Sequence, residues 1–256
     1  MQIIRFSQAG GAPQYGWLLD DKVGLIEGSP FAAFRRDEAD IELEKVDLLS
    51  PVEPSKIICV GRNYVAHAQE HDVDVPEVPL LFLKPPSSIV GPGGTIFLPP
   101  QTQRVEHEAE LAVVIGQRSR WLNPETAKAA ILGYTIANDV TARDLQRRDG
   151  QWTRGKGFDT FCPVGPWIET DFDPADAVVT CNVNGELRQM GSTRDMVFPV
   201  LQLIAYASSV MTLEPGDILL TGTPAGVGPL VDGDELVSSI EGLGELRNPV
   251  RAEPPH

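Results

Sequence analysis

The sequence predicts a β-rich α+β fold with a small N-terminal β domain. Short apolar runs bounded by Gly, Pro and Asp recur along most of the chain, which is typical of strands joined by turns. Helical periodicity is confined to a few stretches, and helices do not alternate regularly with strands as in a doubly wound fold. The 256 residues are enough to bury a core in one large domain or in a domain with a smaller appendage.

The net charge and the cysteines indicate which binding partners and which cellular compartment to expect. A net charge of −15 repels phosphate backbones and anionic lipids, so we expect no nucleic-acid or membrane partner. The three cysteines are widely spaced and include no C-x-x-C pair, which argues against a disulfide framework or a zinc site and fits a reducing compartment. Met1 leads into "QIIRF" with no signal-peptide pattern or membrane span, so we expect the cytoplasm.

Residues 1–52 read as the small β domain. The runs "QIIRF", "YGWLLD" and "KVGLIEG" are strand-like and are separated by Gly, Pro and Asp turns. The two prolines of "DLLSPVEPSK" mark the passage into a main domain, which we expect over residues 53–256.

The main domain is predicted to begin with strands and two short helices. "KIICVGRNY" reads as a buried strand ending at Gly61, and a helical stretch follows over residues 65–72. Residues 79–100 alternate apolar runs with Pro and Gly breaks, as strands and turns do. A helix is expected from Asn123, as N-cap, to Gly133, where the strand "YTIANDVT" takes over.

The C-terminal part supplies a hairpin, a helix and the last strands. Asn184-Gly185 within "AVVTCNVNGELRQ" predicts a type I′ hairpin turn. Residues 199–211 show helical periodicity. "GDILLTGTPAGVG" reads as a strand that runs into a Gly/Pro loop, and residues 232–250 supply the final strands.

The stretch "RVEHEAELAVVIG", residues 104–116, reads as a strand that opens with three glutamates. Side chains alternate along a strand, so Glu106, Glu108 and Glu110 share one face at spacings of about 6–7 Å. Two such carboxylates can bend toward one cation, and oxygen ligands suit Mg²⁺, Mn²⁺ or Ca²⁺. Asp139, on another apolar strand, favours this interpretation over a solvated strand end. The alternation does not decide which two glutamates bind.

His67 and Glu70, in "GRNYVAHAQE", are three residues apart and therefore neighbours on a helical turn. A carboxylate there can orient the imidazole, fix its tautomer and raise its basicity, as a general base requires. The alternative is an exposed polar pair on a surface helix. His71 and His107 are weaker candidates for ligands, since His107 would point to the strand face opposite the glutamates.

Two glycine-containing loops carry further polar candidates. Lys156, between glycines in "TRGKGFDTFCPVGP", could hold a carboxylate or an enolate, or could be a loop lysine in solvent. "LLTGTPAGVG" lacks the ending of a phosphate-binding P-loop, and it offers Thr223 as a hydroxyl donor. The simplest interpretation of Arg143 and Asp144 in "TARD" is that they pair with each other.

Six motifs in this order resemble the fumarylacetoacetate hydrolase family. They are "VGRNYxxHxxE", "FLKPPSS", "HEAELAVVIG", "NDVTARDLQ", "KGFDTFCPVGP" and "GDILLTGTPAGVG", and the resemblance covers residues 55–250. It is closest to the acylpyruvate hydrolase and oxaloacetate decarboxylase type. It implies a mixed β-sandwich roll as catalytic domain, a homodimer, and one Mg²⁺ or Mn²⁺ per active site.

The resemblance also implies roles for individual residues. The implied metal ligands are Glu108, Glu110 and Asp139, which leaves Glu106 as a flanking residue. The implied catalytic residues are His67, Glu70 and Lys156, the first two as an acid/base pair on a segment, residues 65–75, that often acts as a lid in the family. The implied substrate-binding residues are Arg143, Gln146 and Thr223. Lys84 in "FLKPP" has either a structural role or a place in the site.

These parts imply an enzyme acting on a small 2-oxo acid. The expected reaction is hydrolysis of a C–C bond in an acylpyruvate, giving pyruvate and a carboxylic acid, with His67 activating water. Oxaloacetate decarboxylation and isomerisation of a 2-hydroxyhepta-2,4-diene-1,7-dioate-type substrate are alternatives on the same site. Two rival classes are a glycosidase with paired carboxylates and a non-catalytic metal-binding module. The segments "HDVDVPEVP" and "QRRDGQW" are expected to shape the specificity.

Overall fold

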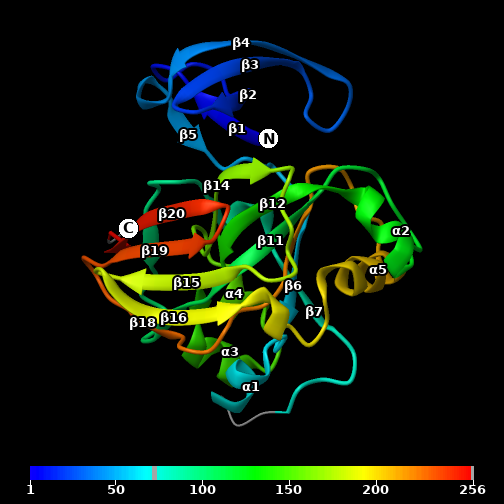
Figure 1. Cartoon of the computed structure of the whole chain (residues 1–256). Helices are drawn as coiled ribbons and strands as arrows, with labels where there is room; N and C mark the ends of the chain where they lie inside the picture. Colours follow the sequence, from blue (N-terminus) through cyan, green and yellow to red (C-terminus); the bar gives the residue numbers. More distant parts are fainter. Residues whose placement is uncertain (71–73, 255–256) are drawn as a thin grey trace.

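The structure, a computed structural model, describes residues 1–70 and 74–254 and has three sheets (Figure 1). The main sheet has the strand order β4-β3-β2-β1-β14-β12-β11-β17-β6-β7, with β5 paired to β1 and β8 paired to β14. A second sheet has the order β16-β15-β19-β20-β9, and a small third sheet has the order β13-β10-β18. The β-rich fold class predicted from the sequence is therefore confirmed. His71 and the middle of the expected lid lie outside the described residues.

The bounds of the strands follow in chain order. They are β1 Gln2–Ser7, β2 Gln14–Leu19, β3 Lys22–Gly28, β4 Phe34–Glu42, β5 Asp47–Leu49, β6 Ile57–Gly61, β7 Leu80–Lys84, β8 Ile89–Val90, β9 Ile96–Leu98, β10 Val105–His107, β11 Ala109–Ile115, β12 Ile131–Asn138, β13 Thr141–Ala142, β14 Cys162–Glu169, β15 Val178–Val183, β16 Glu186–Ser192, β17 Ile218–Leu220, β18 Gly228–Leu230, β19 Glu235–Ile240 and β20 Gly244–Ala252.

The helices are short. The α-helices are α1 Val65–Glu70, α2 Pro124–Ala127, α3 Arg143–Asp149, α4 Thr153–Lys156 and α5 Val200–Val210. The 3₁₀ helices are η1 Leu43–Lys45, η2 Pro86–Ser88, η3 Lys128–Ala130 and η4 Thr193–Asp195. Among the described residues, no helix is long and apolar enough to cross a membrane.

Several local predictions are confirmed by the backbone. Asn123 caps α2, because its side chain accepts a hydrogen bond from the backbone N–H of Thr126. Asn184 and Gly185 both have positive φ, at 54° and 79°, as a type I′ turn between β15 and β16 requires. Residues 199–211 contain α5 as expected.

Two boundaries differ from the prediction. The helix expected to reach Gly133 ends with η3 at Ala130, because β12 begins at Ile131 to pair with β11. The single strand expected over residues 104–116 is divided at Glu108: β10 belongs to the small sheet and β11 to the main sheet. The chain therefore changes sheets at one of the three glutamates.

The strand β11 is buried on both faces, which accounts for its continuous apolar run. Leu111, Val113 and Ile115 enter the largest hydrophobic core, where β15 and β19 of the second sheet contact β11 and β12. Ala112 and Val114 face a second core against β6, β14 and β17. Glu110 has the parity of the latter face and lies at the end of the strand where a pocket opens.

The N-terminal strands extend the main sheet. β1 pairs antiparallel with β14, so β1 to β4 form one edge of the main sheet (blue in Figure 1). They also enclose a small core of their own, which includes Ile4, Phe6 and Val23. The helices α1 and α3 lie at the end of the molecule opposite the N-terminal strands (Figure 1), and α4 contacts α3; all three helices contribute residues to the pocket described next.

Candidate active site

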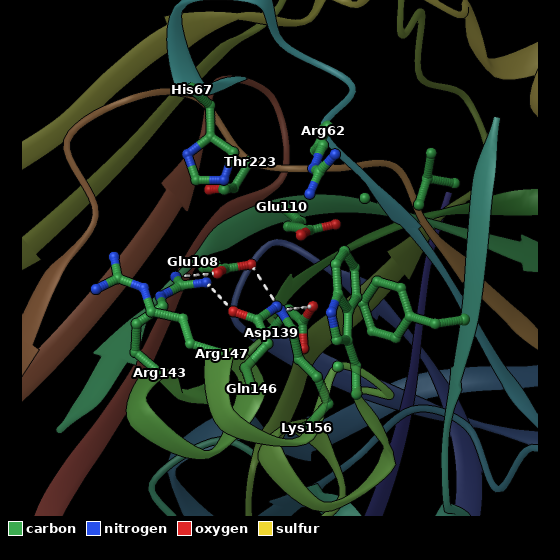
Figure 2. Close-up of a pocket in the computed structure, with 15 residues that line it drawn as sticks. Arg62, His67, Glu108, Glu110, Asp139, Arg143, Gln146, Arg147, Lys156 and Thr223 are labelled. Atoms are coloured by element: carbon green, nitrogen blue, oxygen red, sulfur yellow. Dashed lines mark hydrogen bonds and ion pairs between the residues drawn. The ribbon is translucent and has the colours of Figure 1, made fainter. Parts of the chain in front are cut away.

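A pocket of about 380 Å³ lies where β6, β7, β11, α1, α3 and α4 converge (Figure 2). It brings together eight of the nine site residues that the sequence and the resemblance indicated. The residues lining it are Val60, Gly61, Arg62, His67, Phe82, Glu108, Glu110, Asp139, Arg143, Gln146, Arg147, Gly150, Trp152, Lys156 and Thr223. The ninth, Glu70, does not line the pocket but lies next to His67.

Three carboxylates converge at the floor of this pocket. Glu108 joins β10 to β11, Glu110 lies on β11, and Asp139 directly follows β12. They meet because β11 and β12 pair antiparallel with Ala109 opposite Asn138. One ligand atom from each lies within 4.8 Å of the others, and all three side chains are buried. Of the three glutamates in this segment, Glu108 and Glu110 share the group with Asp139, and Glu106 does not.

Buried cations balance two of these acids. Lys156 Nζ lies 2.9 Å from Glu108 Oε2 and 2.6 Å from Asp139 Oδ2. Lys84 Nζ donates to Asp139 Oδ1 at 2.6 Å from outside the pocket lining, and Arg143 Nη2 pairs with Glu108 Oε1. Burial by itself would lower the pKa of Lys156, but Asp139 and Glu108 raise it. Lys156 is therefore a buried, charged side chain, and the interpretation as a loop lysine in solvent is wrong.

Glu108 and Glu110 differ in electrostatic environment. Burial would raise the pKa of Glu108, but Lys156 and Arg143 outweigh burial and lower it. Glu110 has no ion-pair partner among the described residues, and its Oε2 accepts from the Gly222 N–H at 2.6 Å. Burial, then Asp139 and Glu108, raise the pKa of Glu110.

The three acids fit a hard divalent cation. All the candidate ligand atoms are carboxylate oxygens, which suit Mg²⁺ and Mn²⁺. Glu110 is a buried carboxyl group whose pKa is raised by burial and by the neighbouring acids, so an additional positive charge would favour its ionised form. The chemistry of the donor set thus agrees with the metal that the sequence resemblance implies.

His67 projects into the pocket from α1, and Glu70 stands behind it. Their Nδ1 and Oε2 atoms are 3.5 Å apart, and both Glu70 oxygens accept from the Gly226 N–H at 3.2 Å. The His67 side chain is buried, so the interpretation as an exposed surface pair is wrong. Burial lowers the pKa of His67, which favours the neutral imidazole that a general base requires.

Gln146 and Thr223 line the pocket, as expected of substrate-binding residues. Gln146 accepts a hydrogen bond from Arg143 Nη1 at 2.6 Å. The hydroxyl of Thr223 donates to the carbonyl of Ala109 at 2.8 Å and accepts from Gln189 Nε2 at 2.7 Å. Its single proton is directed to Ala109, so the expectation of Thr223 as a hydroxyl donor to a ligand is corrected: its remaining lone pair can only accept.

Other candidates lie outside the pocket. Glu106 pairs with Arg143 and with Arg104, which agrees with a flanking role. Arg143 does not pair with Asp144 as expected, because Asp144 turns to Thr102 and the Gln103 N–H while Arg143 turns inward to the glutamates.

His107 also lies outside the pocket. It contacts Gln189 Oε1 through Nδ1 at 2.9 Å, away from the carboxylates. This placement agrees with its predicted orientation to the opposite strand face.

Three further residues contribute to the pocket wall. Arg147 and Trp152 come from "QRRDGQW", and Arg147 is one helical turn after Arg143, so the i, i+4 spacing could have placed it on the same face. Arg62 was missed. It follows the end of β6 in the left-handed region, with φ 59°, a conformation that the sequence pattern did not signal.

The fold and this site define a β-rich enzyme with a buried acidic cluster that can hold a divalent cation. The chain belongs to the fumarylacetoacetate hydrolase family: residues 56–251 match the model described as fumarylacetoacetate (FAA) hydrolase C-terminal. Residues 1–51 match a second model, described as Rv2993c-like, N-terminal.

Similar proteins carry several enzyme names. The human protein named oxaloacetate tautomerase FAHD2A, mitochondrial, is 48% identical over 219 residues, which cover 80% of this chain and 70% of that protein. A structure from Mycobacterium marinum, titled 2-hydroxyhepta-2,4-diene-1,7-dioate isomerase, is 44% identical with a TM-score of 0.91 and covers 100% of both chains. A fumarylacetoacetate hydrolase structure from Exiguobacterium antarcticum is 42% identical with a TM-score of 0.86, covering 99% of this chain and 100% of that one.

Proposed function

We propose that the protein moves a proton between the keto and enol forms of a 2-oxo dicarboxylic acid, as a tautomerase or isomerase that depends on Mg²⁺ or Mn²⁺. The observation that carries the proposal is the convergence, in one pocket, of a buried histidine, a carboxylate cluster and two guanidinium groups that have no ion-pair partner in the part of the chain that the structure describes. We prefer proton transfer to the C–C hydrolysis expected from the sequence, because proton transfer needs only these groups and no attacking water.

The carboxylates supply the binding site for the cation. Glu108, Glu110 and Asp139 would hold it, and when bound it would act as a Lewis acid that stabilises an enolate oxygen. Lys156 and Arg143 lie against the same acids and add fixed positive charge at the edge of the site. Such preorganised charge stabilises an anion that forms during the reaction.

His67 would transfer the proton. Its lowered pKa favours the neutral imidazole, which can accept a proton from the carbon next to the keto group and return it to the enolate oxygen, or carry out the same transfer in reverse. Glu70, held by the Gly226 N–H, would orient the ring. His67 is neutral again once it has returned the proton, so the reaction needs no second substrate.

Arg62 and Arg147 favour a dianionic substrate. Both line the pocket, and neither has an ion pair or hydrogen bond within residues 1–70 and 74–254. In Figure 2 they lie apart, on either side of the carboxylate cluster. A guanidinium without a protein partner suits a carboxylate on the ligand, since it offers paired N–H donors. Pyruvate-type monoacids would leave one such group unused.

Hydrolysis of acylpyruvates is the second candidate. The same His67–Glu70 pair could activate water against the distal carbonyl, and a relative of 42% identity is titled a fumarylacetoacetate hydrolase. Decarboxylation of oxaloacetate would use the same enolate stabilisation without water. The homodimer implied by the resemblance also remains a proposal, and sedimentation of the purified protein would test it.

The test compares two reactions in the same preparations. Enol oxaloacetate is followed by the decay of its ultraviolet absorption, and acetylpyruvate by pyruvate release, each with Mg²⁺, with Mn²⁺ and after EDTA. We expect metal-dependent enol decay, lowered about 10²–10⁴-fold in His67→Ala. Gln69→Ala, an exposed change on the same helix, is the control. Faster pyruvate release than enol decay would favour the hydrolase, and activity that survives EDTA would reject both.

A further inference from the structure

Gln189 lies outside the pocket lining but contacts two of the segments that build the site. It is on β16 and fully buried. Its Oε1 accepts from the Ala109 N–H at 3.1 Å and faces His107 Nδ1 at 2.9 Å. Its Nε2 donates to Thr223 Oγ1 at 2.7 Å and to the Pro224 carbonyl at 2.8 Å.

These contacts fix the orientation of the amide. The Ala109 N–H can only donate and the Pro224 carbonyl can only accept, so the oxygen must face Ala109 and the nitrogen must face Pro224. His107 Nδ1 must then carry a proton. All four hydrogen-bonding positions of the amide are used, which makes Gln189 a rigid connection rather than an adaptable one.

One side of this connection holds the carboxylate segment. Ala109 stands between Glu108 and Glu110, and Gln189 binds its N–H while Thr223 binds its carbonyl. Ala109 begins β11 just after the chain has passed from the small sheet to the main sheet, and it is paired with β12 on one side only, because the pairing of β11 with β17 begins at Ala112. Gln189 therefore contributes to the spacing of two of the candidate metal ligands.

The other side holds the loop over residues 221–226. Within this loop the Gly222 N–H binds Glu110, Thr223 lines the pocket, and the Gly226 N–H binds Glu70. Gln189 anchors the loop at Thr223 and Pro224. In Figure 2 Thr223 lies on the same side of the pocket as His67.

We propose that Gln189 is a positioning residue for the active site: through its donor side it holds Thr223 against the substrate, and through its acceptor side it holds the segment that carries Glu108 and Glu110. The substrate part rests on the proposed function, since it requires that a 2-oxo acid binds in this pocket. The metal part does not require this.

The two sides can be separated by substitution. Gln189→Glu keeps a side chain of the same size and an oxygen that accepts from Ala109, but it has no N–H to donate to Thr223 and Pro224. Gln189→Leu removes both sides. Thr223→Val removes only the hydroxyl, and Thr223→Ser restores it. Gln202→Leu, an exposed change on α5, is the matched control.

Calorimetry measures Mn²⁺ affinity and, at saturating Mn²⁺, the affinity for malate, a 2-hydroxy dicarboxylate whose hydroxyl can donate to the free lone pair of Thr223. We expect Thr223→Val to weaken malate binding about fivefold in the wild-type background and to have no further effect in Gln189→Leu, because Gln189 acts on the ligand through Thr223. Thr223→Ser restores the affinity. Gln189→Leu weakens Mn²⁺ binding, whereas Gln189→Glu weakens malate binding but not Mn²⁺ binding.

Other outcomes decide against the proposal. An equal loss on Thr223→Val in both backgrounds would show that Thr223 does not depend on Gln189. Gln189 variants that lower the melting temperature but bind Mn²⁺ and malate normally would show a structural role only. If Gln189→Leu does not fold, Gln189→Glu with Thr223→Val forms the cycle. If malate does not bind the wild type, the proposed function fails, while the Mn²⁺ comparison still tests the acceptor side.

Discussion

Charged side chains are buried at the pocket end of the main sheet and exposed at its N-terminal end. At the pocket end, Glu108, Asp139, Lys156 and Arg143 are buried in mutual contact. At the N-terminal end, pairs such as Arg35–Glu27, at 2.8 Å, lie on the exposed surface of β3 and β4. Breaking a buried pair leaves an uncompensated charge, whereas an exposed charge is rehydrated by water. The same residue types thus organise a site at one end and solvate a surface at the other.

Lys156→Met should reveal the largest difference between the two ends. It leaves Glu108 and Asp139 facing each other without Lys156, so we expect the metal-free protein to lose about 3–5 kcal/mol of stability. Chemical denaturation of metal-free samples measures this loss, with Lys128→Met as an exposed control. Because a divalent cation would replace the missing charge, Mn²⁺ should stabilise the variant more than the wild type. A variant as stable as Lys128→Met would contradict the coupling.

Glu110→Gln should separate metal binding from stability within the buried cluster. The pKa of Glu110 is raised, so the folded state binds this proton more tightly than the unfolded chain does. The stability that comes from this tighter proton binding is fully present below the unfolded pKa of 4.5, and it is lost as the pH rises through the folded pKa. Glutamine removes that penalty, so the metal-free variant should be at least as stable as the wild type at neutral pH. Its Mn²⁺ affinity should fall at least about tenfold.

Calorimetry in two buffers of different ionisation enthalpy sharpens this prediction. Wild-type protein should release a proton when Mn²⁺ binds, and its affinity should rise with pH, because Glu110 must ionise to bind. Glu110→Gln should release fewer protons. The same proton release from both proteins would exclude Glu110 as the titrating ligand.

Arg35→Ala should have the smallest effect. Arg35 and Glu27 are both more than half exposed, so their attraction is screened by water and salt. We expect no measurable change in the denaturation midpoint or in Mn²⁺ affinity, at low or high salt. A marked salt-dependent destabilisation would mean that the N-terminal end relies on its surface charges more than its burial suggests.

The strand and helix pattern was predictable because it depends on local periodicity, turn residues and caps. The hairpin at Asn184-Gly185 and the cap at Asn123 need only a few neighbouring residues. The break at Glu108 was not predictable, because it depends on which strands lie beside β10 and β11. An unbroken run of alternating residues contains no signal that a chain changes partners.

In the site, too, local features were predictable and long-range features were not. His67 with Glu70 is a local pair that spacing can reveal, and the resemblance supplied the identity of the three acids. The orientation of Thr223 depends on Gln189, which is 34 residues away in the chain and joined to it only by folding. The position of Arg62 in the pocket depends on a left-handed backbone conformation, which is uncommon for arginine and is not indicated by the sequence. Long-range partners and unusual backbone angles are therefore what the sequence could not provide.

Glu110 lies on β11 and Asp139 directly follows β12, so the register that sets Ala109 opposite Asn138 also sets the separation of these two carboxylates. A slip of β11 against β12 by one residue would turn the side chains of one strand to the other face of the sheet. The same two strands contribute Leu111 and Ile136 to the largest core, where these residues lie opposite each other. Correct packing of the core and the convergence of the acids therefore depend on a single alignment.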